Sequence, residues 1–235
     1  MITRWCGAEE NAIYSLAYSC GSMVTMLMTS MNSAYAPWLG EKLKAGKHDE
    51  IREFSKKYIL GFTFLATGIM AVAPEVLYIL GGKAYQEVKY VMAPIAMGCV
   101  CQFIYTMFVN VEQFKKKTVG MAIASVIAAL VNLVLNYIFI PKVGYIAAAY
   151  TTLADYIVLL GIHMFLVYKL NLSDVYDYKV IVNMVLVMLG ITFFMNAMYS
   201  FSFVRYIFVG TYVLICALLF VRNKDELFGY SKRRS

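Results

Sequence analysis

One carboxylate lies deep within a long apolar stretch of this sequence. Asp155 is ten residues after Tyr145, where the apolar stretch begins, so it lies about 15 Å along a helix that rises about 1.5 Å per residue. That depth is near the middle of a bilayer whose hydrocarbon core is about 30 Å thick. A carboxylate there needs a partner, a wet cavity or a proton. Asp155 is therefore a candidate for cation or proton coupling or for a cavity lining, and the alternative is a neutral or hydrogen-bonded Asp that joins two helices.

Three more polar side chains lie near Asp155 in the sequence. Asn132 and Asn136 are four residues apart, and this spacing places both amides on one face of a helix. That face could line a polar path or hydrogen-bond to another helix. His163 is eight residues after Asp155, about 12 Å further along the same helix. We therefore expect no contact between these two side chains, and we interpret His163 as a structural residue.

A second group of polar residues lies upstream, in another apolar stretch. Gln102, Asn110 and Glu112 run towards the basic sequence 115–117. They could line the cytoplasmic mouth of a cavity, or they could belong to the ordinary polar end of a helix. The sequence alone leaves both interpretations open.

The sequence contains no pattern that predicts an enzyme. It has no Gly-rich phosphate loop, no HExxH, no nucleophile elbow and no CxxC. With two histidines in total, a His-rich metal or acid–base site is excluded. The five cysteines have no metal-ligand spacing, and we interpret them as apolar packing residues. We assign no catalytic residue, no metal ligand and no cofactor.

The composition predicts an all-α polytopic membrane protein. Of the 235 residues, 61% are hydrophobic and 15% are charged, whereas about 25% of a soluble domain is charged. The charges fall in clumps between long uncharged stretches. At about 20 residues per crossing, we expect about seven transmembrane helices. Their predicted ranges are Ala12–Trp38, Tyr58–Leu80, Val88–Val111, Val119–Ile140, Tyr145–Tyr168, Val180–Tyr199 and Phe203–Val221.

Two of these helices form a predicted hairpin around the residues described first. One helix ends at Ile140, a tight turn follows over Pro141–Gly144, and the next helix begins at once. A turn this short forces the helices to lie antiparallel and adjacent. The small residues Ala147–Ala149 allow a neighbouring helix to pack closely.

The distribution of basic residues predicts the orientation. If the segment 40–57 is cytoplasmic, sixteen of the 21 lysine and arginine residues lie on that side of the membrane. This is a clear positive-inside bias. The N-terminus is then outside and the C-terminus inside. The net charge of +7 is therefore explained by topology, and we expect no nucleic-acid partner.

The hairpin also resembles a known family. Its residues NLVLNYIFIPKVGYIAAAYTTLADYIV resemble the signature N..LN...IP..G..GAA..T of polysaccharide-export flippases of the Wzx type, within the multidrug/oligosaccharidyl-lipid/polysaccharide (MOP) exporter superfamily. Ile146 stands where the family often has Gly. Three other stretches agree. The family's eighth helix and the loop after it are resembled by AIYSLAYSCGSMVTMLMTSMNSAYAPWLGEKLKAGKHDEI. The end of its ninth helix, the outer loop and the start of its tenth are resembled by APEVLYILGGKAYQEVKYVMAPIAMG. The lysines before Val119 resemble the basic turn before its eleventh helix.

The resemblance covers roughly Ala12–Tyr168 and implies the C-terminal half of a MATE-like flippase. It divides the chain into an outer segment (1–11), five transmembrane helices of the second flippase lobe (12–168), two appended transmembrane helices (169–221) and a basic cytoplasmic tail (222–235). A first lobe, in the same or another chain, is expected to complete the transporter.

The function implied by the resemblance is transmembrane export. The cargo would be a polyprenyl-diphosphate-linked oligosaccharide, flipped across the bacterial cytoplasmic (inner) membrane in surface polysaccharide biosynthesis, such as that of O-antigen and lipopolysaccharide. The expected partners are this lipid-linked substrate, membrane lipids, the missing lobe, and a polymerase or ligase of the same pathway. Family members use ion gradients, and Asp155 is the candidate coupling residue.

Other functions fit the same sequence. A cation-coupled multidrug antiporter or a lipid II flippase would keep the fold and change the cargo. A membrane-embedded glycan polymerase or acyltransferase would need large outer loops with clustered Arg, His or Asp, and the outer connections here are short. A truncated, inactive product of a decayed gene would have the same residues and differ only in context.

Overall fold

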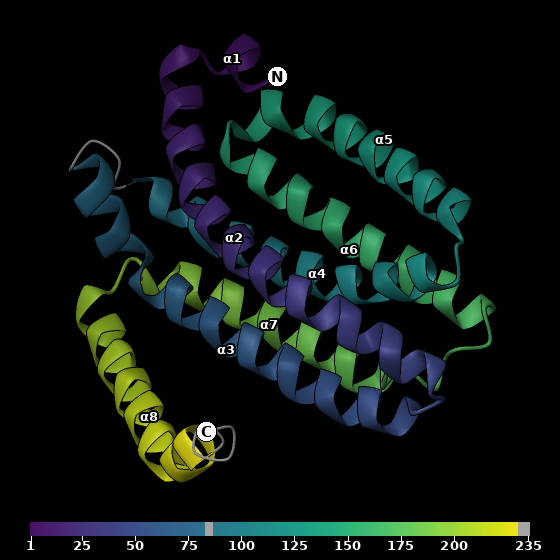
Figure 1. The fold of residues 1–235 in the computed structure, drawn as a ribbon. Helices are drawn as coiled ribbons and strands as arrows, with labels where there is room; N and C mark the ends of the chain where they lie inside the picture. The colour runs from purple at the N-terminus through teal and green to yellow at the C-terminus, as the bar shows by residue number, and fades with distance from the viewer. Residues whose placement is uncertain (83–86, 230–235) are drawn as a thin grey trace.

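The computed structural model, which describes residues 1–82 and 87–229, places one helix at the centre of the others (Figure 1). This helix, α4 (Lys89–Phe114), is apolar on all sides, and most of its side chains are buried. A helix that is hydrophobic all round is expected to be enclosed by other helices. The remaining helices are α1 (Ile2–Trp5), α2 (Ala8–Lys44), α3 (His48–Gly81), α5 (Thr118–Val143), α6 (Ile146–Lys169), α7 (Tyr178–Met198) and α8 (Ser202–Gly229).

The other long helices form an uneven shell around α4. Helices α2, α3, α6 and α7 pack directly against it, whereas α5 packs mainly on the outer side of α6. Helix α8 contacts α3 and α7 and points away from the bundle (Figure 1). Most side chains of α5 are exposed, including Val126, Leu130 and Leu133. Such an apolar exposed surface is typical of a helix that faces lipid.

The predicted all-α polytopic membrane fold is confirmed. Five helices, α3 to α7, are long and apolar enough to cross a membrane. The other two predicted spans differ from these five. Helix α2 has 37 residues but a more polar sequence, and in α8 the apolar stretch among the described side chains is Ser202–Leu218.

Several helices extend beyond the predicted apolar spans. The largest difference is at α3, which begins at His48 rather than Tyr58. Its first turns are charged, and ion pairs three residues apart, Lys47–Glu50 and Lys56–Glu53, link successive turns. The predicted span of α3 covered only the part of the helix that is suited to the hydrocarbon of the membrane. The charged first turns of α3 extend beyond it into water.

The predicted hairpin is present, but its turn lies later than predicted. Helix α5 continues through Pro141 to Val143, and the chain reverses at Gly144, whose φ is +83°. The Gly144 N–H donates to the Ile140 carbonyl at 2.9 Å, which satisfies a carbonyl at the helix end. Helices α5 and α6 pack as antiparallel neighbours, and Ala147–Ala149 are buried, as predicted.

The two ends of the chain contain more helix than expected. The predicted outer segment 1–11 contains α1 and the first turn of α2. The predicted tail 222–235 begins within α8, which continues to Gly229, and residues 230–235 lie outside the described residues.

Candidate functional site

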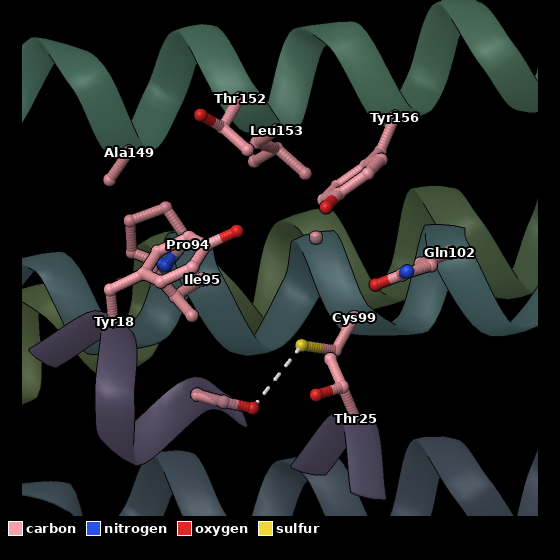
Figure 2. A pocket seen from close by; sticks show the side chains of 12 residues that line it. Tyr18, Thr25, Pro94, Ile95, Cys99, Gln102, Ala149, Thr152, Leu153 and Tyr156 are labelled. Carbon is pink, nitrogen blue, oxygen red and sulfur yellow. Dashed lines mark hydrogen bonds between the residues drawn. The ribbon is translucent and has the colours of Figure 1, made fainter. Parts of the chain in front are cut away.

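A small cavity lies between α2, α4 and α6. It has a volume of about 70 Å³, and five polar side chains reach it from the three helices, together with apolar side chains such as Ile95 and Leu153. Figure 2 shows these side chains around the shared space. The polar side chains are Tyr18 and Thr25 from α2, Gln102 from α4, and Thr152 and Tyr156 from α6. Polar groups inside a bundle of apolar helices are costly unless they serve a hydrated or ligand-binding space.

Glycines allow the helices around this cavity to approach closely. A Cβ on Gly21 would lie 2.5 Å from Cγ2 of Ile95, and a Cβ on Gly98 would lie 3.1 Å from the ring of Tyr156. Both positions line the cavity. Because glycine has no Cβ, α2 can pack closely against α4 at Gly21, and α4 can pack closely against α6 at Gly98.

Helix α2 has an exposed stripe of hydroxyl groups. We call its members, Ser15, Ser19, Thr29, Ser30 and Ser33, the α2 hydroxyl stripe. Each hydroxyl donates to the backbone carbonyl four residues earlier, at 2.7 to 3.0 Å. The stripe makes α2 more polar than its neighbours, although the apolar Met26 is also exposed on this helix. Each hydroxyl proton is satisfied within the helix, and the hydroxyl oxygens have further acceptor capacity for a polar partner.

The predicted residues Asn132, Asn136 and Asp155 lie along the α5–α6 interface. The Asn136 amide donates to Asn132 Oδ1 at 2.7 Å, and the Thr151 hydroxyl donates to Asn136 Oδ1 at 2.6 Å. Asn136 therefore links two helices, which was one of its two predicted roles. Helices α5 and α6 are antiparallel, and Asn136 is paired with Thr151. Asn132 is four residues before Asn136 and Asp155 is four residues after Thr151, so Asn132 and Asp155 lie at the same level of the two helices.

Asp155 itself is half-buried. Its Oδ1 atom is buried and has no hydrogen-bond partner in the part of the chain that the structure describes. Thr152 and Tyr156, its neighbours on α6, line the cavity, whereas Asp155 does not. Asp155 is thus a carboxylate with an unsatisfied oxygen, next in sequence to a residue that lines the cavity, which leaves it able to accept a proton or a donor group.

The predicted residues of α4 fall at separate places. Gln102 lines the cavity. The Asn110 amide donates to Asn32 Oδ1 at 2.7 Å and links α4 to α2. Glu112 was a candidate for the mouth of a cavity or for an ordinary polar helix end, but only 1% of it is exposed, and its Oε1 lies 2.7 Å from Nδ1 of His163. The His163 side chain thereby joins α6 to α4.

The six predicted residues therefore do not form one cluster. The sequence also did not indicate four of the five polar side chains at the cavity, namely Tyr18, Thr25, Thr152 and Tyr156. One signal for the α2 hydroxyl stripe was present, because Ser15, Ser19, Thr29 and Ser33 recur at multiples of about one helical turn.

Comparison with known proteins gives one match. A protein-family model described as MatE matches residues 1–138, from α1 into α5. No curated protein and no solved structure matches the chain. The match covers more than half of the sequence, and five helices of the described chain are long and apolar enough to cross a membrane. This multi-pass membrane protein belongs to the MatE family of transporters.

Proposed function

We propose that this chain is the second lobe, with two appended helices, of a transporter that flips a polyprenyl-diphosphate-linked oligosaccharide across the bacterial cytoplasmic membrane. The observation that carries this proposal is the exposed α2 hydroxyl stripe on a bundle whose outer surface is otherwise largely apolar. In the proposed transporter the stripe faces a polar passage, and a first lobe from the same or another polypeptide forms the opposite wall.

Transport of this kind involves no covalent chemistry. The protein lowers the cost of moving a polar head group through hydrocarbon, which is several kcal/mol for each unsatisfied polar group. The hydroxyls of the stripe suit a glycan, since each oxygen can accept a hydrogen bond from a sugar hydroxyl while its own proton is donated to the helix backbone. From Asn11 to Gly40, α2 contains no charged residue, so the cations that neutralise the diphosphate would come from the first lobe. Movement of one lobe against the other would give alternating access.

Asp155 is the proposed coupling residue. Its buried Oδ1, which has no hydrogen-bond partner among the described residues, supports this role. In a complete transporter, we expect Asp155→Asn to reduce export and to weaken its dependence on the ion gradient. Export with unchanged gradient dependence would remove Asp155 from the mechanism and leave it as a helix-joining residue.

The position of the α2 hydroxyl stripe can be tested directly. Single cysteines at Ser15 and Ser33, in a background without the five native cysteines, should react with a membrane-impermeant maleimide in native membranes. Leu130→Cys on α5 is the matched control, since Leu130 is 55% exposed on a surface that we assign to lipid. Labelling of the control but not of the stripe would contradict the proposed passage.

The cargo requires a separate assay. Proteoliposomes that contain the chain together with a first lobe should translocate a labelled polyprenyl-diphosphate oligosaccharide, and we expect the 235-residue chain alone not to do so. Translocation by the chain alone would overturn the two-lobe proposal. No translocation by the complete transporter would overturn the cargo.

A multidrug antiporter is the second candidate. The aromatic rings of Tyr18 and Tyr156 at the cavity favour it, because rings of this kind attract organic cations. Exchange of a cationic dye against an ion gradient by the same proteoliposomes would support this alternative.

A further inference from the structure

A second polar cavity lies at the end of the bundle where α3 ends and where α4 and α8 begin (Figure 1). Its volume is about 380 Å³, much larger than the roughly 30 Å³ that one water occupies. It lies at the other end of α3 from the cytoplasmic turns, and no residue of the α2–α4–α6 cavity lines it. The lining residues used below are Glu75, Tyr78, Lys89, Ser202, Arg205 and Tyr206.

Arg205 is the most deeply placed cation of this cavity. It is 3% exposed, and its Nη1 and Nη2 atoms each lie 2.5 Å from a carboxylate oxygen of Glu75. Nη1 also donates to the Ala71 carbonyl at 3.0 Å. The Nε atom is buried and has no hydrogen-bond partner among the described residues. One donor of a buried guanidinium is therefore unused, and leaving a buried charged donor unpaired is costly.

The second cation of the cavity, Lys89, forms no ion pair with a carboxylate among the described residues. Lys89 lies over the ring of Tyr90, with its Nζ 5.1 Å from the ring centroid, and takes part in none of the ion pairs found among residues 1–82 and 87–229. Lys89 and Arg205 together carry two positive charges against the one negative charge of Glu75. Among the described residues, the lining thus has an excess of one positive charge.

Helix geometry adds to this positive character. Ser202 is the first residue of α8, a helix of 28 residues, and it lines the cavity together with Arg205 one turn later. The N–H groups of a first helical turn point outwards and favour an anion, phosphate above all. Lys89 is likewise the first residue of α4.

The residues around the cavity favour a lipid headgroup as the anion that this positive lining would attract. Ile79 and Phe203 are 79% and 77% exposed, and both are large apolar residues suited to lipid. Tyr78 and Tyr206 line the cavity and are also exposed, as is typical of rings at the level of lipid headgroups. We propose that this cavity binds the phosphate of an anionic phospholipid headgroup, held by Lys89 and the first turn of α8 and attracted by the Arg205 guanidinium in the cavity wall.

The test measures lipid retention by the full chain purified in detergent. Native mass spectrometry after addition of phosphatidylglycerol or phosphatidylcholine should show preferential retention of phosphatidylglycerol. Lys89→Gln should lower the retained phosphatidylglycerol about fivefold, as expected for one lysine near an anionic headgroup. Lys142→Gln is the matched control, because Lys142 is an exposed lysine outside the cavity, and it should leave retention unchanged.

Lys89→Gln is preferred to an Arg205 variant, because loss of Arg205 would leave the Glu75 carboxylate with only the Tyr206 hydroxyl as a partner and could prevent folding. Equal retention of the two lipids, or equal retention by wild type and Lys89→Gln, would overturn the proposal. A third arm adds excess inorganic phosphate. Failure of phosphate to displace the lipid supports a headgroup site, and full displacement would assign the cavity to a soluble phosphate instead.

Discussion

The side chains of His163 and Glu112 form a buried pair across the α4–α6 interface, with Nδ1 of His163 2.7 Å from Oε1 of Glu112. The two side chains are 3% and 1% exposed. The ring of Tyr105 stacks on the imidazole, with 5.6 Å between the ring centroids. The second carboxylate oxygen, Oε2, has no hydrogen-bond partner in the described part of the chain. Glu112 therefore depends strongly on His163.

Removal of one partner from this pair should be costly. His163→Leu leaves the Glu112 carboxylate buried without a donor, and we expect the free energy of unfolding to fall by about 3–5 kcal/mol. Thermal unfolding of the purified chain in detergent measures the loss. The double variant Glu112→Leu with His163→Leu should recover much of it, since no charge then stays unpaired. A loss below about 1 kcal/mol for His163→Leu would show that the pair contributes little.

The glycine spacing of α2 against α4 gives a second prediction. A methyl group at Gly21 would lie 2.5 Å from Cγ2 of Ile95, so Gly21→Ala should force these helices apart and cost about 1–3 kcal/mol. Gly61→Ala on α3 is the matched control, because nothing lies within 4 Å of its Cβ position. The control should raise stability by roughly 0.5–1 kcal/mol through helix propensity. Opposite shifts in melting temperature for the two variants are the expected result, and a neutral Gly21→Ala would contradict the close approach.

The connection between α6 and α7 gives a third prediction. Tyr176 is 2% exposed, and its hydroxyl donates to the Met107 carbonyl at 3.0 Å and lies 3.1 Å from the hydroxyl of Tyr35. Tyr176→Phe should lower the free energy of unfolding by about 1–3 kcal/mol, because buried polar atoms lose a partner. Tyr168→Phe is a suitable control, since Tyr168 is 61% exposed and should change stability by less than about 0.5 kcal/mol. Equal melting temperatures for the two variants would show that Tyr176 does not hold this connection in place.

The fold was largely predictable because lipid requires long apolar helices with internally satisfied backbones. The sequence therefore located α3 to α7 from hydropathy alone. Helix ends were less predictable. Charged turns such as those after His48 continue a helix into water, and Pro141 is tolerated within the last turn of α5.

The candidate site was predicted only in part. Single polar residues within apolar sequence, such as Asp155 and Gln102, were visible because membranes make them costly. Contacts between distant helices were not visible. Glu112 and His163 are 51 residues apart, and only the packing of α6 on α4 joins them. The cavity likewise depends on three helices meeting, which periodicity within one helix cannot indicate.

An ion pair at the cytoplasmic side of the predicted topology gives the last prediction. Nδ1 of His48 lies 2.6 Å from Oδ2 of Asp174, in the connection between α6 and α7. The hydrogen bond to His48 lowers the pKa of the Asp174 carboxyl, against a smaller opposing effect of burial. A carboxyl whose pKa is lower in the folded state than its unfolded value of about 3.9 stabilises the fold above that pH. The contribution is lost as the pH falls through the folded-state pKa.

The size of this contribution is limited by solvent, because 56% of the Asp174 side chain is exposed, and we expect at most about 1 kcal/mol. Melting temperatures of wild type and Asp174→Asn between about pH 3 and pH 6 measure it. Wild type should be the more stable protein at the upper end of this range, and the difference should shrink below about pH 4, where the carboxyl of the unfolded chain takes up a proton. Hydrogen exchange of the backbone amides from Leu172 to Asp177 should show the same dependence, because the pair holds this connection against α3. A difference that stays constant throughout the acid range would mean that the charge of Asp174 does not stabilise the connection.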